Sequence, residues 1–349
     1  MTNETFENWS GVLGSLADGH DIDAETAETV LVSVLHGEAT DAQLAAFVVA
    51  LRQKGETIDE LTGLVRAMRS SCIPIDCPPE TIDLVGAGGS PLGRKAALNV
   101  STIASFVAAG AGAKVCKHGN RKASSTSGSF DLLEELNIAG DLTSDQVSRC
   151  ILEVGVGFAY ARAFHPAMRF AGSVRAELGI PTVFNILGPL SHPGFVKRQV
   201  IGVPLAETGK RMAKVLQATG TELAMVVTGD GGLDELSITG TNTVHTVTAE
   251  TIVTSEVTPE DIGIRRVSQK EIYGGDAKAN ATIAKSVLGG AEGPKREIIA
   301  FNAAAGLVVA GIADNLIEGL DRAYASIDSG AASESLENLV TLTQEMSNQ

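Results

Sequence analysis

A glycine-rich loop at residues 86–102, GAGGSPLGRKAALNVST, has the composition of an anion-binding site. Its glycines let backbone N–H groups approach an anion closely, and Arg94 and Lys95 add positive charge. A helix expected to begin near Ser101 would add the positive end of its dipole. The glycine spacing resembles that of a phosphate-binding P-loop, although an Arg–Lys pair stands where that pattern has Lys–Ser/Thr. The loop predicts a phosphate site, and the alternative is a tight turn between a strand and a helix.

A second loop, residues 117–129 (KHGNRKASSTSGS), combines cations with hydroxyl groups. Cationic side chains neutralise phosphate, while hydroxyl and amide groups fix its orientation. Five hydroxyl side chains stand in the six positions 124–129, just before a predicted helix. This density favours a second phosphate contact over an ordinary solvated loop.

Two further segments carry carboxylates and a guanidinium. Asp234 and Glu235 are adjacent in GDGGLDELS, residues 229–237. Such hard oxygen ligands suit Mg²⁺, whose shell is usually completed by water and substrate phosphates. Their alternative is helix capping or surface charge. Arg175 is expected on a helix that follows His165, where its guanidinium could pair with a carboxylate, and its alternative is an ordinary surface charge.

The elements that must position these loops begin with helices. Asp23 can cap a helix that we expect to run through residues 36–39. Thr40 with Gln43 and Thr57 with Glu60 form capping boxes for two more helices. Short connections between these helices indicate a small bundle.

The proline-rich stretch at residues 73–80 marks the expected domain junction. We predict a small all-helical domain at residues 1–75, completed by helices within 164–190, and a large domain at 76–349. Strands alternate with helices in the large domain, which indicates an α/β fold with a mostly parallel central sheet flanked by helices. The three polar loops each follow a predicted strand, so we expect them on one edge of the sheet, where ligands bind.

Composition narrows the functional classes. The formal net charge of −15 argues against a nucleic-acid partner. Four scattered cysteines do not form a disulfide scaffold, and the N-terminus lacks the features of a secretory signal, so we expect a cytoplasmic protein. The longest apolar stretch, residues 298–313, is rich in Ala and Gly and predicts a buried helix rather than a membrane span.

Together and in this order, the motifs resemble the anthranilate phosphoribosyltransferase family of the tryptophan pathway. The resemblance rests on NVST, KHGNR with SSTSGS, HPAM, VRAELG, FNILGPL, GDGGLDEL and GGDAKANA, and it covers nearly the whole chain. It implies a two-domain homodimer of the nucleoside phosphorylase/phosphoribosyltransferase-like fold. It further implies transfer of the 5-phosphoribosyl group from phosphoribosyl pyrophosphate (PRPP) to the amine of anthranilate, with Mg²⁺ as cofactor and pyrophosphate as leaving group.

The resemblance also implies roles for individual residues, with no side chain acting as a general acid or base. Lys117, Asn120 and Arg175 would position the reactants. The residues implied for PRPP are Gly86, Gly89, Ser90, Asn99, Ser101, Thr102, Lys117, Ser125 and Ser129. Those implied for anthranilate are His118, Asn120, His165 and Arg175, and those implied for Mg²⁺ are Ser101, Asp234 and Glu235.

The first loop departs from the family pattern GTGGDGANTFNIST. Ser90 replaces its Asp, Ala87 and Ala97 replace its threonines, and the loop is longer and more basic. In the second loop, Thr126 replaces the lysine of SSKSG. Two alternatives follow: a related phosphoribosyltransferase with a different aromatic acid acceptor, or a pyrimidine nucleoside phosphorylase of the same fold. A non-catalytic relative that binds nucleic acid is a third, which the acidic charge disfavours.

Overall fold

The computed structural model describes residues 6–91, 96–122 and 125–347. The chain forms two compact units, each described separately below. Unit 1 comprises residues 1–74 and 162–195, and unit 2 comprises residues 75–161 and 196–349.

Unit 1 is helical. Its elements are α1 (Trp9–Ala17), α2 (Ala24–Leu35), α3 (Asp41–Lys54), α4 (Ile58–Ser70), most of α9 (Ala161–Phe164), the 3-10 helix η1 (Pro166–Met168), α10 (Arg169–Leu178) and α11 (Phe184–Leu190). The predicted capping boxes are confirmed, because Thr40 and Thr57 each accept the backbone N–H three residues on, at 3.2 Å in both cases. Asp23 also caps as predicted, accepting from the N–H of Thr26 at 2.7 Å. The expected extension of this helix through residues 36–39 is wrong: α2 ends at Leu35, and Gly37 has a φ of +78° that no helix continues.

Unit 2 is an α/β domain. Its strands are β1 (Ile82–Gly86), β2 (Val115–Gly119), β3 (Val156–Tyr160), β4 (Arg198–Gly202), β5 (Leu223–Thr228), β6 (Asn242–Thr248) and β7 (Ile252–Val257). Its α-helices are α6 (Val100–Gly110), α7 (Ser129–Glu135), α8 (Ser144–Val154), α12 (Ala206–Ala218), α13 (Ala277–Leu288), α14 (Pro294–Val309), α15 (Leu316–Asp328) and α16 (Ala331–Ser347). The described part of unit 2 also contains three 3-10 helices: η2 (Asp230–Gly232), η3 (Pro259–Ile262) and η4 (Gln269–Ile272).

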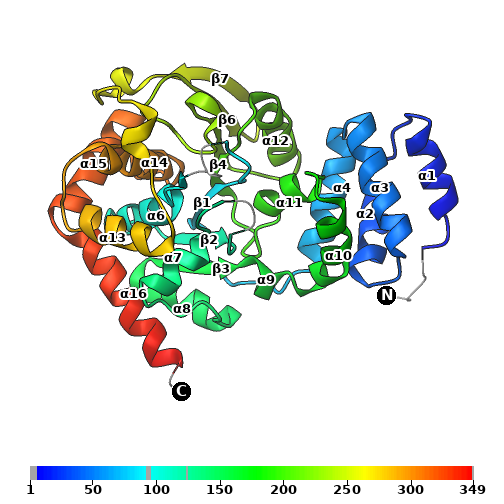
Figure 1. The fold of residues 1–349 in the computed structure, drawn as a ribbon, viewed down its shortest axis with the longest axis horizontal. Coiled ribbons are helices and arrows are strands. Elements are labelled where there is room, and N and C mark those ends of the chain that lie inside the picture. The colour runs from blue at the N-terminus through cyan, green and yellow to red at the C-terminus, as the bar shows by residue number, and fades with distance from the viewer. Residues whose placement is uncertain (1–5, 92–95, 123–124, 348–349) are drawn as a thin grey trace. The chain divides into compact units, whose positions relative to one another are not determined.

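The seven strands of unit 2 form one mixed sheet in the order β3-β2-β1-β4-β5-β6-β7. The pairs from β3 through β5 are parallel, which confirms the mostly parallel sheet. The last two strands pair antiparallel and form a hairpin edge that the sequence analysis did not predict. In Figure 1, α6 and α14 lie on one side of these strands and α12 lies on the other.

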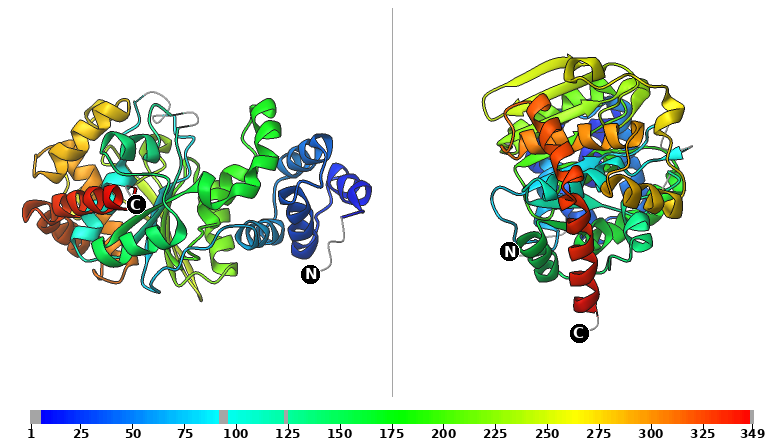
Figure 2. Two further views of the ribbon diagram at one scale, coloured as in Figure 1. Left: turned by 90° about the horizontal axis from the view of Figure 1, so that it is seen from below. Right: turned by 90° about the vertical axis from the view of Figure 1, so that its left-hand side faces the viewer.

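Two helices show how the core of unit 2 is closed. Residues 298–307 of α14 are all buried, in agreement with the predicted buried helix. The C-terminal helix α16, red in Figure 2, packs against α6 and α8. Within the described residues, no helix is both long and apolar enough to cross a membrane.

The topology places three loops together. β1, β2 and β5 run in the same direction, so the loops that follow Gly86, Gly119 and Thr228 leave the same edge of the sheet. These are the glycine-rich, cationic and acidic loops of the sequence analysis.

Candidate active site

The glycine-rich loop turns sharply at the end of β1. Gly88 and Gly89 have φ values of +77° and +87°, which side-chain-bearing residues rarely adopt. The N–H of Gly88 donates to Asp234 Oδ2 at 2.7 Å. A Cβ on Gly86 would lie 2.7 Å from the same oxygen, so glycine at this position lets the acidic loop approach β1.

The acidic loop also contacts the start of α6. The backbone N–H of Ser101 donates to Glu235 Oε1 at 3.1 Å, and the Ser101 hydroxyl bonds the same carboxylate. On the strand side, a Cβ on Gly202 would lie 1.8 Å from the carbonyl oxygen of Asp234. Asp234 and Glu235 are therefore held between β1, β4 and the N-terminus of α6, whose dipole favours negative charge.

The two adjacent carboxylates destabilise each other's charge. Burial, and then the neighbouring Asp234, raise the pKa of Glu235 to about 8. Burial likewise raises the pKa of Asp234, and the Gly88 N–H opposes that shift. Such a pair is stabilised by a cation that both side chains can share.

A buried lysine supplies positive charge to this cluster. Lys117 on β2 is 2% exposed, and its Nζ donates to the His118 carbonyl at 3.3 Å. Burial lowers the pKa of Lys117, and Asp83, Glu235 and Asp234 act against that shift. Lys117 is therefore near enough to all three acids for their charges to act on it.

Asp83 is a member of this cluster that sequence reasoning missed. It is fully buried in β1, where its Oδ1 accepts the His118 N–H at 3.1 Å and its Oδ2 accepts from Gln199 Nε2 at 3.4 Å. Burial raises its pKa to about 7, opposed chiefly by Lys117. The available signal was an acid inside the apolar strand TIDLVG, where a charge needs a partner.

The hydroxyl-rich loop lies against the start of α6. Asn99, at the N-cap, accepts from the hydroxyl of Ser127 at 2.9 Å and donates to the Ser127 carbonyl at 3.3 Å. Ser125 donates to the same carbonyl at 3.1 Å, and Thr102 is buried within α6. Three of the residues implied for PRPP, Asn99, Thr102 and Ser125, are thus in or beside one helix N-terminus.

The KHGNR segment begins buried, at Lys117 and His118, and ends exposed, at Asn120 and Arg121. Arg121 pairs with Glu134 at 2.5 Å and lies 3.6 Å from Asp131, so it holds the loop to α7. Asn120 is exposed, its Oδ1 accepts the Arg121 N–H at 2.8 Å, and its carbonyl receives the Ser129 hydroxyl at 3.4 Å. The Asn120 amide nitrogen is thereby directed away from its own backbone.

The altered part of the first loop is only partly described. Ser90 is 2% exposed, and its hydroxyl has no hydrogen-bond partner among the described residues. Arg94 and Lys95, which the sequence analysis assigned to an anion, lie outside the described residues.

His165 and Arg175 belong to unit 1, and unit 2 holds the other candidate residues. His165 is buried, which lowers its pKa to about 4 and keeps the imidazole neutral at pH 7. Arg175 on α10 is half-buried, with its guanidinium 5.2 Å from the centre of the Phe184 ring. This cation–π contact orients a charge for which the described residues provide no ion pair.

The arrangement in unit 2 fits a divalent cation bound together with a phosphate ligand. No group of three or more His, Cys, Asp or Glu side chains able to hold a metal occurs among the described residues. Asp234, Glu235 and the Ser101 hydroxyl offer three oxygen donors, fewer than the six of an octahedral Mg²⁺ shell. Phosphate oxygens and water would complete it, and the glycine loop provides N–H groups at the same place.

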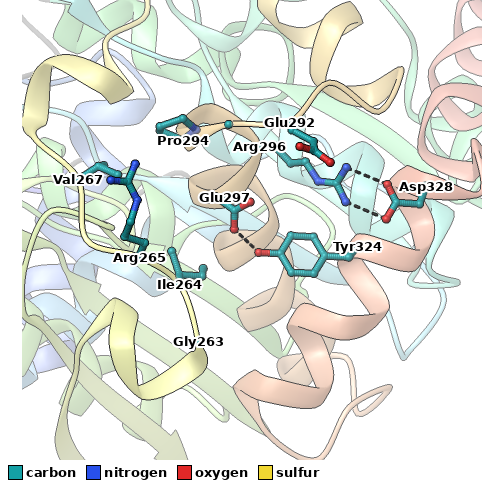
Figure 3. A pocket seen from close by; sticks show the side chains of 11 residues that line it. Gly263, Ile264, Arg265, Val267, Glu292, Pro294, Arg296, Glu297, Tyr324 and Asp328 are labelled. Carbon is teal, nitrogen blue, oxygen red and sulfur yellow. Dashed lines mark hydrogen bonds and ion pairs between the residues drawn. The ribbon is translucent and has the colours of Figure 1, made fainter.

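A cavity elsewhere in unit 2 lacks this chemistry. It has a volume of about 550 Å³ and lies beside the N-terminus of α14. Figure 3 shows two pairs of side chains that interact across it: Arg296 with Asp328, and Tyr324 with Glu297. None of the residues expected to act on a substrate lines it.

Comparison with protein families gives two adjoining matches. The helical bundle domain of the glycosyl transferase family matches residues 10–72, and the a/b domain of that family matches residues 78–333. An anthranilate phosphoribosyltransferase of Rhodococcus jostii is 45% identical over 341 residues, covering 96% of this chain and 93% of that protein. One of Bradyrhizobium diazoefficiens is 44% identical over 338 residues, covering 97% and 99%.

Solved structures give the same result. The anthranilate phosphoribosyltransferase of Thermus thermophilus superposes with a TM-score of 0.90 at 37% identity, covering 95% of this chain and 99% of that one. The anthranilate phosphoribosyltransferase of Saccharomyces cerevisiae, in complex with PRPP and Mg, has a TM-score of 0.87 at 28% identity, covering 97% and 98%.

Proposed function

The chain belongs to the anthranilate phosphoribosyltransferase family, and we propose that it transfers the 5-phosphoribosyl group of PRPP to the amine of anthranilate, releasing pyrophosphate. One observation carries the proposal beyond the resemblance. The acidic loop contacts both ends of the first phosphate-binding candidate, residues 86–102, through Gly88 N–H to Asp234 and Ser101 N–H to Glu235, at 2.7 and 3.1 Å. The contacts support the proposal, because a magnesium–pyrophosphate ligand needs oxygen ligands for the metal beside groups that can bind phosphate.

The donor half of the reaction belongs to unit 2. We assign the glycine loop, the N-terminus of α6 and Lys117 to PRPP, because they supply N–H donors and positive charge where pyrophosphate gains negative charge on leaving. The residues assigned to PRPP are Gly86, Gly89, Ser90, Asn99, Ser101, Thr102, Lys117, Ser125 and Ser129. Mg²⁺, held by Ser101, Asp234 and Glu235, would neutralise the leaving group.

Recognition of the acceptor needs a cation and polar groups but no strong base. An aryl amine is neutral at pH 7, so attack on C1 of ribose depends on where the amine is held. We assign Arg175 to the anthranilate carboxylate, since a planar guanidinium can bind it bidentately. Asn120, His118 and His165 are assigned to the same substrate, and the neutral state of His165 at pH 7 excludes it as a cationic partner.

Two properties of the whole protein are part of the proposal. We infer a cytoplasmic location, because the substrates are metabolic intermediates. We infer a homodimer from the family resemblance.

The test is an assay of PRPP consumption with anthranilate and with a panel of other aromatic acids, with and without Mg²⁺. We expect turnover with anthranilate, pyrophosphate as a product, and no turnover once Mg²⁺ is chelated. Turnover with another aromatic acid in preference to anthranilate would favour the paralogue. Phosphorolysis of a pyrimidine nucleoside without PRPP consumption would overturn the proposal.

A further inference from the structure

One buried side chain links three segments around the donor site. Asn280 lies in the first turn of α13, within the motif GGDAKANA, and is 0% exposed. Its Oδ1 accepts the Gly275 N–H at 2.9 Å, and its Nδ2 donates to the Ala97 carbonyl at 2.7 Å and to Asn99 Oδ1 at 2.8 Å. No role for this residue follows from the reaction as described above.

Backbone groups fix which way the Asn280 amide faces. A backbone N–H can only donate and a backbone carbonyl can only accept, so Gly275 requires the oxygen of Asn280 and Ala97 requires its nitrogen. Turning the amide by 180° would place the Asn280 nitrogen against the Gly275 N–H, two donors, and the Asn280 oxygen against the Ala97 carbonyl, two acceptors. The Asn280 nitrogen is therefore held toward Asn99.

The orientation of the Asn280 amide in turn favours one orientation of the Asn99 amide. Asn99 Oδ1 receives hydrogen bonds from Asn280 Nδ2 and from the Ser127 hydroxyl, at 2.8 and 2.9 Å. Its Nδ2 must point the other way, where the Ser127 carbonyl at 3.3 Å is its one acceptor among the described residues. An amide nitrogen has two hydrogens, so one N–H of Asn99 remains available for a ligand.

The surrounding segments hold this linkage in place. Thr126 accepts the Ala97 N–H at 3.0 Å and donates to the Gly275 carbonyl at 2.8 Å. A Cβ on Gly274 would lie 2.2 Å from the Ala97 carbonyl, so the motif lies directly against the end of the glycine-rich loop. The contacts join residues 97–99, 126–127 and 274–280.

We propose that Asn280 is a positioning residue of the PRPP site, which holds the Asn99 amide with its nitrogen toward the phosphoribosyl ligand. The inference rests on the proposed function, because it takes Asn99 to be a PRPP contact. Without Asn280, only the contacts to Ser127 would hold the Asn99 amide, so its nitrogen would be less firmly directed toward the anionic ligand. The consequence is a specific loss of PRPP affinity rather than a general loss of stability.

The test is a double-mutant cycle on the full chain, with PRPP and Mg²⁺ as the probe in calorimetric titrations. Asn280→Asp preserves shape and the bond from Gly275, but it sets an oxygen against Ala97 and Asn99. We expect it to weaken PRPP binding about tenfold, the effect of misdirecting one hydrogen bond to a charged ligand. In an Asn99→Ala background, the same change should weaken binding by less than about twofold, since there is no longer an amide to position.

The cycle separates positioning from the negative charge that the Asn280→Asp change would introduce, because a charge effect would persist in the Asn99→Ala background.

Asn242→Asp is the matched control for stability. Asn242 is also 0% exposed, accepts a backbone N–H from Ser237 at 2.6 Å and donates to the Ser237 and Val257 carbonyls at 2.9 and 3.0 Å. It should lower the melting temperature similarly but leave PRPP affinity unchanged.

Ser127→Ala keeps the test decisive if Asn280→Asp does not fold. It removes the other donor to Asn99 Oδ1 and should weaken PRPP binding about threefold, again only when Asn99 is present.

Wild-type affinity in Asn280→Asp, or equal losses in the two backgrounds, would overturn the inference and leave the proposed function intact. A wild-type protein that binds PRPP without using anthranilate would refute the function, and the affinities would still decide the role of Asn280. A wild type that binds no PRPP would overturn both.

Discussion

Replacing Asp234 with Asn should remove a metal ligand without disturbing the loop that carries it. Asp234 Oδ2 accepts the Gly88 N–H at 2.7 Å, and an Asn side chain can turn its own oxygen to the same donor. The change therefore preserves the contact between the acidic and glycine-rich loops. What it removes is one of the two negative charges that would bind Mg²⁺.

The expected loss is at least tenfold in turnover at saturating PRPP, or about 1.4 kcal/mol of additional barrier. The Mg²⁺ concentration for half-maximal rate should also rise. Folding stability should change in the opposite direction: burial raises the pKa of Asp234, which means that the protein without ligands disfavours this charge. Without Mg²⁺ and PRPP, the variant should therefore melt no lower than the wild type. Initial rates across a Mg²⁺ titration and thermal unfolding of the free protein measure the two effects.

Asp230→Asn is the matched control, because it makes the same change of charge in the same loop. Asp230 is exposed, and its carboxylate accepts the Thr239 hydroxyl at 2.8 Å. This variant should retain the wild-type Mg²⁺ requirement. Equal Mg²⁺ midpoints for Asp234→Asn and Asp230→Asn would refute the assignment of Asp234 as a ligand.

Three further predictions concern the acceptor, the altered loop and pH. Arg175→Ala should raise the KM for anthranilate about tenfold, and Arg175→Lys should not restore it, because lysine lacks the planar fork; kinetics with each substrate varied check this, and a raised KM for PRPP alone would contradict it. The double change Arg94→Ala with Lys95→Ala should weaken PRPP binding about tenfold and flatten the salt dependence of that binding. Calorimetric titrations at low and high salt measure both effects, and an unchanged affinity would mean that Arg94 and Lys95 only lengthen the loop. Asp83, with its pKa raised to about 7 beside Lys117, keeps its proton in the native state at pH values where the unfolded carboxyl has lost it, so the unfolding free energy falls as pH rises from about 4 to about 7. Asp83→Asn should flatten that fall in urea titrations across this range, and a slope parallel to the wild type would contradict it.

Local sequence signals predicted the helices of unit 1 and the parallel part of the sheet. The capping boxes at Thr40 and Thr57 form as their spacing requires, since each depends only on residues three apart. The β6–β7 hairpin was missed because its outer strand is mostly exposed and lacks the apolar run of a buried strand. Its pairing is set by the neighbouring β5, which no local pattern reports.

The placement of the site was predictable for a topological reason, while its internal contacts were not. Parallel strands bring their following loops to one edge, so the glycine-rich, cationic and acidic loops could be grouped from chain order alone. The partners of Lys117 and Asn99 could not. Asp83 and Asn280 lie 34 and 181 residues from them along the chain, by subtraction of the residue numbers, and meet them only once the sheet and α13 are formed.

The charge balance of the cluster explains why the first loop can function without an acid. Asp83, Asp234 and Glu235 all interact electrostatically with one buried cation, Lys117, and burial raises the pKa of each acid in spite of that cation. An acid at position 90 would add a further acidic group to the loop that we assign to pyrophosphate. Ser90 instead provides a buried hydroxyl in this loop, and a hydroxyl can donate to phosphate at any pH. On the proposed site, the substitution would therefore lower the repulsion that PRPP meets, and it would leave Mg²⁺ and Lys117 to balance the acids that remain.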